Sequence, residues 1–302
     1  MKIKETINGD IVKNKKEKFY YFKQCLENHK IGLDKGAKVL EPILSYNKNL
    51  IMNGSPARIL SNIFWNSLDF SQVHEELREK INFLEIGCGS GRYGTLIEKL
   101  SKKYFGSYTG LDIYLDNNFP EKFYHLKIDA EKINLETLKD INFIFSQSSL
   151  EHIKNDSEVL FNTTKILSES KKKFISIHLI PAKSSLFLYA WHGWRQYSLR
   201  NINKIACDLM RLSNVSVYAI PLGGPESFKA HIKYTFANKI FAKFPIFNTQ
   251  VYRSKLSHHI VKCVTRELKC CNKNPIFWIL IISNFEQGNY LKLKPPQPIC
   301  YN

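Results

Sequence analysis

Short apolar runs alternate with segments of helical periodicity through the middle of the chain. The apolar runs cover residues 81–86, 107–113, 124–128, 142–146 and 173–180, and the helical segments lie between them. Strands that alternate with helices of this length form βαβ units, in which neighbouring strands are parallel. The pattern therefore predicts an α/β domain built on a parallel sheet.

The alternation changes beyond Pro181. Mostly helical stretches at about 184–212 and 226–270 each precede one further apolar run, at 215–220 and at 276–282. Two late strands separated by an insertion fit the antiparallel edge that is often added to such sheets. We therefore expect a doubly wound, mostly parallel seven-stranded sheet with an antiparallel edge strand and a helical insertion before the last strand.

The first 78 residues show no strand and helix alternation. Their periodicity predicts a helix over about 14–28 and two short amphipathic helices near 61–65 and 73–77. We expect residues 1–78 to form an N-terminal helical cap on one α/β domain of residues 79–302.

Hydropathy and cysteine content indicate the compartment. The strongest apolar run, 276–282, is much shorter than the roughly 20 residues that cross a bilayer, and no apolar segment of a signal peptide follows the basic N-terminus. The seven cysteines form an odd set without a Cys-x-x-Cys pair, which favours a reducing compartment over disulfides or structural zinc. The sequence thus predicts a cytoplasmic protein.

The net charge of +17 is unevenly distributed along the 302 residues. Residues 41–150 carry 12 basic and 14 acidic side chains, whereas residues 151–302 carry 22 basic and only 8 acidic ones. A strongly basic half attracts anionic partners such as nucleic acid, phosphorylated small molecules, acidic glycans or an anionic membrane surface. Charge alone does not choose among these partners, and general solubility is the alternative explanation.

The first apolar run leads directly into Gly87, Gly89 and Gly91. Glycines serve where the backbone turns sharply or where a ligand approaches the main chain closely. The G-x-G-x-G spacing differs from the G-x-G-x-x-G of dinucleotide-binding loops. Glu85, two residues before the first glycine, would repel a pyrophosphate but favour a cationic amine or sulfonium. These features favour S-adenosylmethionine over a nicotinamide dinucleotide.

With these residues the chain resembles the class I S-adenosylmethionine-dependent methyltransferases, whose first motif is an acidic residue followed by this glycine spacing. Asp112 ends the next strand, where a carboxylate can accept both ribose hydroxyls. In the family the residue after it, here Ile113, packs on the adenine. The family often places an acidic residue at the position of Asp129 to accept from the adenine amino group, with the following amide close to the ring.

The fourth predicted strand contains Phe143 and ends in polar residues. Leu-Glu-His-Ile follows at 150–153, and this stretch is similar to the fourth motif of the family. The resemblance implies a Rossmann-like fold with S-adenosylmethionine as cofactor. The residues that it assigns to cofactor binding are Glu85, Gly87, Cys88, Gly89, Gly91, Asp112, Ile113, Asp129, Ala130, Ser146 and Gln147.

A hydroxyl acceptor must lose its proton as it attacks, and a near-neutral histidine suits that task. Three histidines are candidates: His152 just past the fourth strand, His178 at the end of the fifth, and His192 in the segment 191–197. For His152 the alternative is a packing or helix-capping role. No group of His, Asp and Glu residues has convincing metal-ligand spacing, so we expect no metal.

The segment 191–197 is rich in aromatic and hydrogen-bonding side chains around one glycine. It could stack on a flat ring or a sugar while Arg195 pairs with a phosphate or carboxylate. The alternative is an amphipathic helix whose tryptophans lie in the core. Where nucleobase and amide methyltransferases carry Asn/Asp/Ser-Pro-Pro-Tyr/Phe, this chain has Ser146-Gln147-Ser148-Ser149, which favours an oxygen acceptor.

Three functions remain open. The first is O-methylation of a small molecule or glycan precursor, with an anionic acceptor and a histidine base, because the pattern resembles methyltransferases of surface-polysaccharide pathways. The second is RNA methylation, since residues 195–270 hold 13 basic and 3 acidic side chains interleaved with aromatic residues. The third is a non-catalytic protein that binds S-adenosylmethionine. Peripheral membrane contact also stays open.

Overall fold

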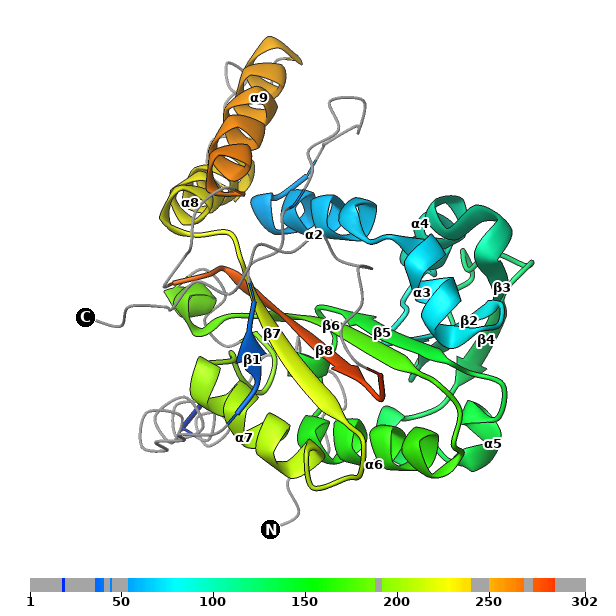
Figure 1. Ribbon diagram of the computed structural model, residues 1–302. Helices are drawn as coiled ribbons and strands as arrows, with labels where there is room; N and C mark the ends of the chain where they lie inside the picture. The colour runs from blue at the N-terminus through cyan, green and yellow to red at the C-terminus, as the bar shows by residue number, and fades with distance from the viewer. Residues whose placement is uncertain are drawn as a thin grey trace.

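The computed structural model describes residues 18–19, 36–40, 44, 54–187, 192–239, 250–268 and 274–285. Within them, one mixed sheet runs through the molecule with helices on both faces (Figure 1). Its strands are β1 (Lys38–Val39), β2 (Ile81–Ile86), β3 (Phe105–Asp112), β4 (Tyr124–Lys127), β5 (Phe143–Gln147), β6 (Ile175–Pro181), β7 (Ser216–Leu222) and β8 (Phe277–Ser283).

The strand order is β1-β7-β8-β6-β5-β2-β3-β4, and β8 alone runs antiparallel to its neighbours among the described strands. The predicted doubly wound, Rossmann-like class is confirmed, with two differences in detail. The short strand β1 makes the sheet eight-stranded, and the antiparallel strand lies inside the sheet rather than at its edge. The interior position of β8 follows from its composition. The strand carries apolar side chains on both faces, and in the sheet interior every one of its residues is buried.

The helices divide between the two faces of the sheet. One face is covered by α2 (Pro56–Ser67), α3 (Phe70–Leu77) and α4 (Arg92–Ser101), and the other by α5 (Leu135–Leu138), α6 (Asp156–Glu169) and α7 (Leu199–Leu209) (Figure 1). The chain also forms short 3-10 helices, which are η1 (Lys102–Tyr104), η2 (Ala130–Lys132), η3 (Leu150–His152) and η4 (Lys183–Phe187).

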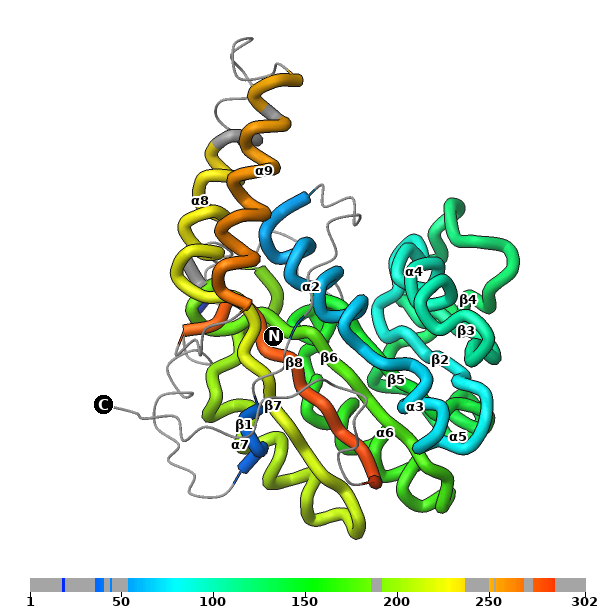
Figure 2. The backbone as a smooth tube through the Cα atoms, turned by 45° about the horizontal axis from the view of Figure 1, so that its top comes forward, coloured from blue at the N-terminus to red at the C-terminus, as the bar shows by residue number. Residues whose placement is uncertain are grey.

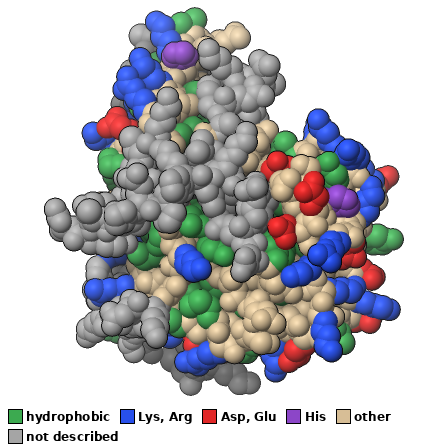
Figure 3. Space-filling view, in the orientation of Figure 1, with side chains coloured by type: hydrophobic (Ala, Val, Ile, Leu, Met, Phe, Trp, Pro, Cys, Tyr) green, Lys and Arg blue, Asp and Glu red, His purple; other side chains and the backbone are tan. Residues whose placement is uncertain are grey.

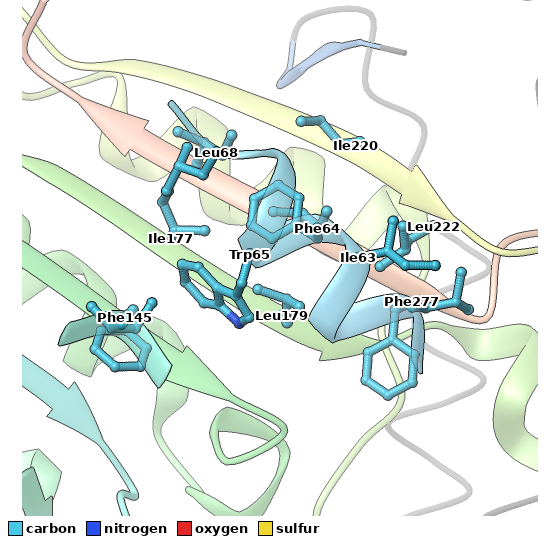
Figure 4. Packing of buried hydrophobic residues seen from close by; sticks show 14 of the residues in the cluster. Ile63, Phe64, Trp65, Leu68, Phe145, Ile177, Leu179, Ile220, Leu222 and Phe277 are labelled. Atoms are coloured by element: carbon cyan, nitrogen blue, oxygen red, sulfur yellow. The ribbon is translucent and has the colours of Figure 1, made fainter. Parts of the chain in front are cut away.

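Aromatic side chains from α2 and the sheet fill the core on the first face. Trp65 is fully buried and meets the ring of Phe145 edge-on at 5.3 Å between centroids, and Phe64 lies beside it (Figure 4). Leu68 and Ile177 pack in the same cluster. The helix that carries Trp65 is therefore an integral layer of the fold, packed directly on the strands.

The insertion before the last strand forms two helices, α8 (Pro225–Lys239) and α9 (Gln250–Glu267), which pack side by side and project beyond the sheet (Figure 2). This confirms the helical prediction for the described part of 226–270. The helical prediction for 184–212 is wrong at 192–198, which form no helix. The Ser198 side chain instead caps α7, so that helix begins at Leu199.

The predicted helices near 61–65 and 73–77 are confirmed as α2 and α3, which are longer than expected because Ser55 and Asp69 cap them with their side chains. The predicted helix 14–28 lies outside the described residues apart from 18–19. The division into a cap of residues 1–78 and a domain of residues 79–302 stays a prediction. No helix within the described ranges combines the length and the apolar character needed to cross a membrane.

Candidate active site

The loops that follow β2, β3, β4, β5 and β6 meet at one edge of the sheet, because these strands are neighbours and parallel. The glycine loop after β2 folds back on β3: the amides of Gly87 and Cys88 both donate to the Leu111 carbonyl, at 2.8 and 3.1 Å. Gly89 has φ +49°, and a Cβ built there would have no heavy atom within 4 Å. The loop therefore leaves open space beside its main chain.

Asp112 lies at the end of β3, next to this loop. Its carboxylate accepts hydrogen bonds from the amides of Gly89 at 2.9 Å and Tyr114 at 3.3 Å, and its side chain is half-buried. A carboxylate has about four acceptor positions, so two remain for a ligand. Ile113, the next residue, is also half-buried.

Asp129 and Ala130 follow β4 at the same edge. The Asp129 side chain caps η2 by accepting a hydrogen bond from the Glu131 amide at 3.0 Å, and Ala130 is buried. The structure thus brings the glycine loop, Asp112 and Asp129 together, as the sequence pattern predicts.

Glu85 has a different environment from the one that its charge suggested. Its side chain is 1 % exposed and accepts a hydrogen bond from the Tyr108 hydroxyl of β3. Burial raises the pKa of this carboxyl to about 8 and raises the pKa of the neighbouring Cys88 thiol as well. Both side chains are therefore uncharged at neutral pH, and Glu85 supports the strand pair beneath the loop.

Ser146 and His178 form a buried polar cluster within the sheet. The Nδ1 atom of His178 lies 2.8 Å from the Ser146 hydroxyl, and its Nε2 atom lies 2.6 Å from the Ser176 hydroxyl. Burial lowers the pKa of His178 to about 3, so the ring is neutral. Because both ring nitrogens are engaged and the side chain is fully buried, His178 does not reach the loops where an acceptor could bind.

Gln147 joins the end of β5 to α2. It accepts a hydrogen bond from the Trp65 indole at 3.1 Å and donates one to the Ser61 hydroxyl at 2.9 Å. The sequence analysis missed this contribution of α2 to the site. The only signal was the amphipathic pattern around Trp65, which does not identify a partner 82 residues away.

His152 and His192 lie together although forty residues separate them in the chain. Their ring centroids are 4.6 Å apart, with the planes at 87°. The buried side chain of Glu151 completes a cluster of three, and one possible ligand atom from each residue lies within 4.8 Å of the others. Sequence spacing did not predict this cluster.

Two contacts hold the His192 loop against η3. The Trp194 amide donates to the Glu151 carbonyl at 2.5 Å. Gly193 has φ +70°, and a Cβ there would lie 2.5 Å from the same carbonyl, so only glycine permits this approach.

A buried ion pair fixes the same two segments further along. Arg195 donates to the fully buried Asp156 carboxylate and to the Lys154 carbonyl, and Tyr197 donates to Asp156. Burial raises the pKa of Asp156, and the Arg195 guanidinium opposes this shift. Arg195 therefore has a structural partner, contrary to the suggestion that it pairs with a ligand phosphate. Trp194 and Tyr197 are buried, and Trp191 lies outside the described residues.

Comparisons with known proteins identify the domain. Residues 66–208 match the family model for a methyltransferase domain. Similar solved structures include an S-adenosylmethionine-dependent methyltransferase from Archaeoglobus fulgidus, at 16 % identity, 77 % coverage of this chain, 96 % of that chain and a TM-score of 0.45. A putative sarcosine dimethylglycine methyltransferase from Galdieria sulphuraria has 12 % identity, 89 % and 97 % coverage and a TM-score of 0.47.

The plantazolicin methyltransferase BamL, solved with a desmethyl analogue and S-adenosylhomocysteine, shares 16 % identity over 75 % of this chain and 85 % of its own, with a TM-score of 0.48. No curated protein matches the sequence. The assignment rests on the family match and on the geometry of the sheet edge.

That edge fits the cofactor of the family. Open space beside Gly89 permits close approach to the main chain, and Asp112 keeps acceptor positions for ribose hydroxyls. Residues 66–208 thus form a methyltransferase domain, and the sheet edge that they build fits S-adenosylmethionine as its cofactor.

Proposed function

We propose that the protein methylates an oxygen atom of a small molecule or glycan precursor, with an anionic acceptor. The observation that carries this proposal is the contact of the His152 ring, in η3 after β5, with the His192 ring. Ser149, three residues before His152, donates to the Ile86 carbonyl at 2.6 Å and so ties the loop after β5 to the start of the glycine loop.

The cofactor supplies, when bound, a methyl group activated by its sulfonium. On the protein side, Asp112 is expected to hold the ribose, Ile113 and Ala130 to contact the adenine, and Asp129 to accept from its amino group. The main chain at Gly89 gives the closest approach. Of the other predicted contacts, Glu85 and Ser146 act from within the sheet, through Tyr108 and His178.

The acceptor hydroxyl must lose its proton, and we assign its uptake to an imidazole of the His152 and His192 pair. Both rings are partly exposed, in contrast to His178. We therefore do not propose His178 as the group that accepts the proton.

The basic half of the chain supports an anionic acceptor. Lys and Arg side chains lie along the α8 and α9 end of the molecule with few acidic side chains among them, whereas on the opposite side basic and acidic side chains are mixed (Figure 3). Such a field raises the local concentration of anions. The cysteine pattern of the sequence supports a reducing, cytoplasmic location.

The test is transfer of labelled methyl from S-adenosylmethionine by the purified full-length protein to a fractionated cell extract. We expect label that survives nuclease and migrates with small molecules or nucleotide sugars. Asp112→Asn should abolish this label and the thermal stabilisation by S-adenosylhomocysteine, which reaches about 2.7 kcal/mol at 100-fold excess over the dissociation constant.

Two other outcomes would replace the proposal. Label that nuclease removes, with binding that weakens steeply as salt rises, would indicate an RNA acceptor, for which the basic residues of 195–270 are the specific observation. Stabilisation by S-adenosylhomocysteine without any labelled product would indicate a binding protein that has kept the fold.

A further inference from the structure

Glu151, His152 and His192 place a carboxylate and two imidazoles at one point of the sheet edge. Their possible ligand atoms lie within 4.8 Å of one another, and the His152 Nε2 atom lies 3.9 Å from a Glu151 carboxylate oxygen. Within the described ranges this is the one group of three or more such side chains with ligand atoms this close. We propose that these three residues bind a divalent metal ion with the ligand preferences of zinc.

The chemistry of the donor set supports zinc. Two histidines and one carboxylate are a recurrent ligand set of catalytic zinc sites, which keep a further position open. Two imidazole nitrogens also favour zinc over magnesium or calcium, which prefer oxygen ligands. A zinc ion with bonds of about 2.0–2.1 Å needs its ligand atoms roughly 3.3 Å apart. The partly exposed rings of His152 and His192 can rotate to close this difference.

The fold holds the two segments together independently of any metal. Leu150, fully buried, anchors η3, and the Trp194 amide binds the Glu151 carbonyl. The buried pair of Arg195 and Asp156 fixes the same two segments a few residues further on. Because the ligands are already gathered, metal binding would cost little ordering of the chain.

The burial of the three side chains indicates which side of a bound ion would stay open. Glu151 is 1 % exposed and would lie beneath the ion, whereas both imidazoles are partly exposed. The remaining coordination positions would then face the partly exposed side and accept an acceptor oxygen. This role rests on the proposed function and replaces the histidine base in it, because an imidazole nitrogen that binds zinc has no lone pair left for a proton, whereas zinc lowers the pKa of an oxygen bound to it. The binding itself does not rest on the proposed function.

The test is a zinc titration of the full-length protein after removal of metals with a chelator, followed by calorimetry and metal analysis. We expect one equivalent of tightly bound zinc. His152→Ala and His192→Ala should each weaken zinc binding by at least about 100-fold. Losing only a hydrogen-bond partner of a metal ligand weakens binding by up to about 100-fold, and losing the ligand itself should weaken it at least as much. Stabilisation by S-adenosylhomocysteine should persist in both variants and shows that they are folded.

The matched control is His259→Ala. On α9 the His259 ring nitrogen lies 3.7 Å from the Cys263 sulfur, so this pair is a second place where zinc could bind. Tight zinc binding that survives in His259→Ala supports the proposal. Binding that disappears there, or that is unchanged in His152→Ala and His192→Ala, overturns it. Because no methyl donor or acceptor is present, failure of the metal site is distinguishable from failure of the methylation proposal.

Discussion

Glu85 lies inside the sheet, where its carboxyl group accepts a hydrogen bond from Tyr108 and where burial raises its pKa to about 8. The group is protonated in the folded protein at pH 7 but ionised in the unfolded chain, whose reference pKa is 4.5. When the pKa of an acid is higher in the folded than in the unfolded protein, the stability that this group contributes is fully present below the unfolded-state pKa. It is lost as the pH rises through the folded-state pKa.

We therefore predict that the free energy of unfolding falls between about pH 5 and pH 8, by up to about 1.4 kcal/mol per pH unit from this group. Glu85→Gln keeps an oxygen that accepts from Tyr108 but does not titrate, so its stability should vary less across this window. Urea unfolding at several pH values measures both proteins. The exposed Glu169→Gln is the control, and an unchanged pH dependence in Glu85→Gln would contradict the prediction.

At the scale of elements, α8 and α9 are joined through one carboxylate. Glu267, at the end of α9, accepts hydrogen bonds from the amides of Glu226 at 2.6 Å and Ser227 at 2.8 Å, in the first turn of α8. It is 8 % exposed. A carboxylate at a helix N-terminus satisfies free amide groups and interacts favourably with the helix dipole.

We predict that Glu267→Ala lowers the free energy of unfolding by about 1–2 kcal/mol, as for loss of a helix cap. Glu226→Gln is the matched control, because that exposed side chain pairs only with Lys229 among the contacts described. Such surface pairs contribute little to stability, because solvent screens them. Denaturant unfolding gives the two values, and hydrogen exchange should show faster opening in α8. Equal effects of the two substitutions would refute a capping role for Glu267.

At the scale of the whole molecule, Trp65 joins the N-terminal helix layer to the centre of the sheet. Its ring packs on Phe145 of β5 (Figure 4). Its indole donates a hydrogen bond to Gln147 at the end of the same strand. The α2 helix and the end of β5 at the site edge are thus coupled through one side chain.

We predict that Trp65→Ala lowers the free energy of unfolding by about 3–5 kcal/mol, because it leaves a cavity in the core. This is a large share of the 5–15 kcal/mol typical of a folded protein. Trp65→Phe fills most of that space and should cost less, which separates packing from the lost hydrogen bond. Thermal and denaturant unfolding measure both variants, and a loss below about 1 kcal/mol in Trp65→Ala would argue against this coupling.

Much of the fold and part of the site could be predicted because the signals are local. The apolar runs that became β2 to β8 each read as a strand from a few consecutive residues, and parallel pairing then brought Asp112 and Asp129 to the glycine loop. The extra strand β1 could not be predicted, because two residues carry no periodicity. The interior position of β8 could have been predicted, because apolar residues lie on both faces of this strand.

The α/β class, the glycine spacing and the carboxyl-edge location of the cofactor site can be inferred without a structure, because they depend on residues adjacent in the chain and on the rule that parallel strands end together. Which of the predicted side chains reach that edge depends on how the folded chain packs. Burial removed the charge of Glu85 and enclosed His178, whereas a buried ion pair and one glycine brought His192 to His152. Burial and pairing across forty residues depend on what packs above each side chain, and no local pattern encodes that.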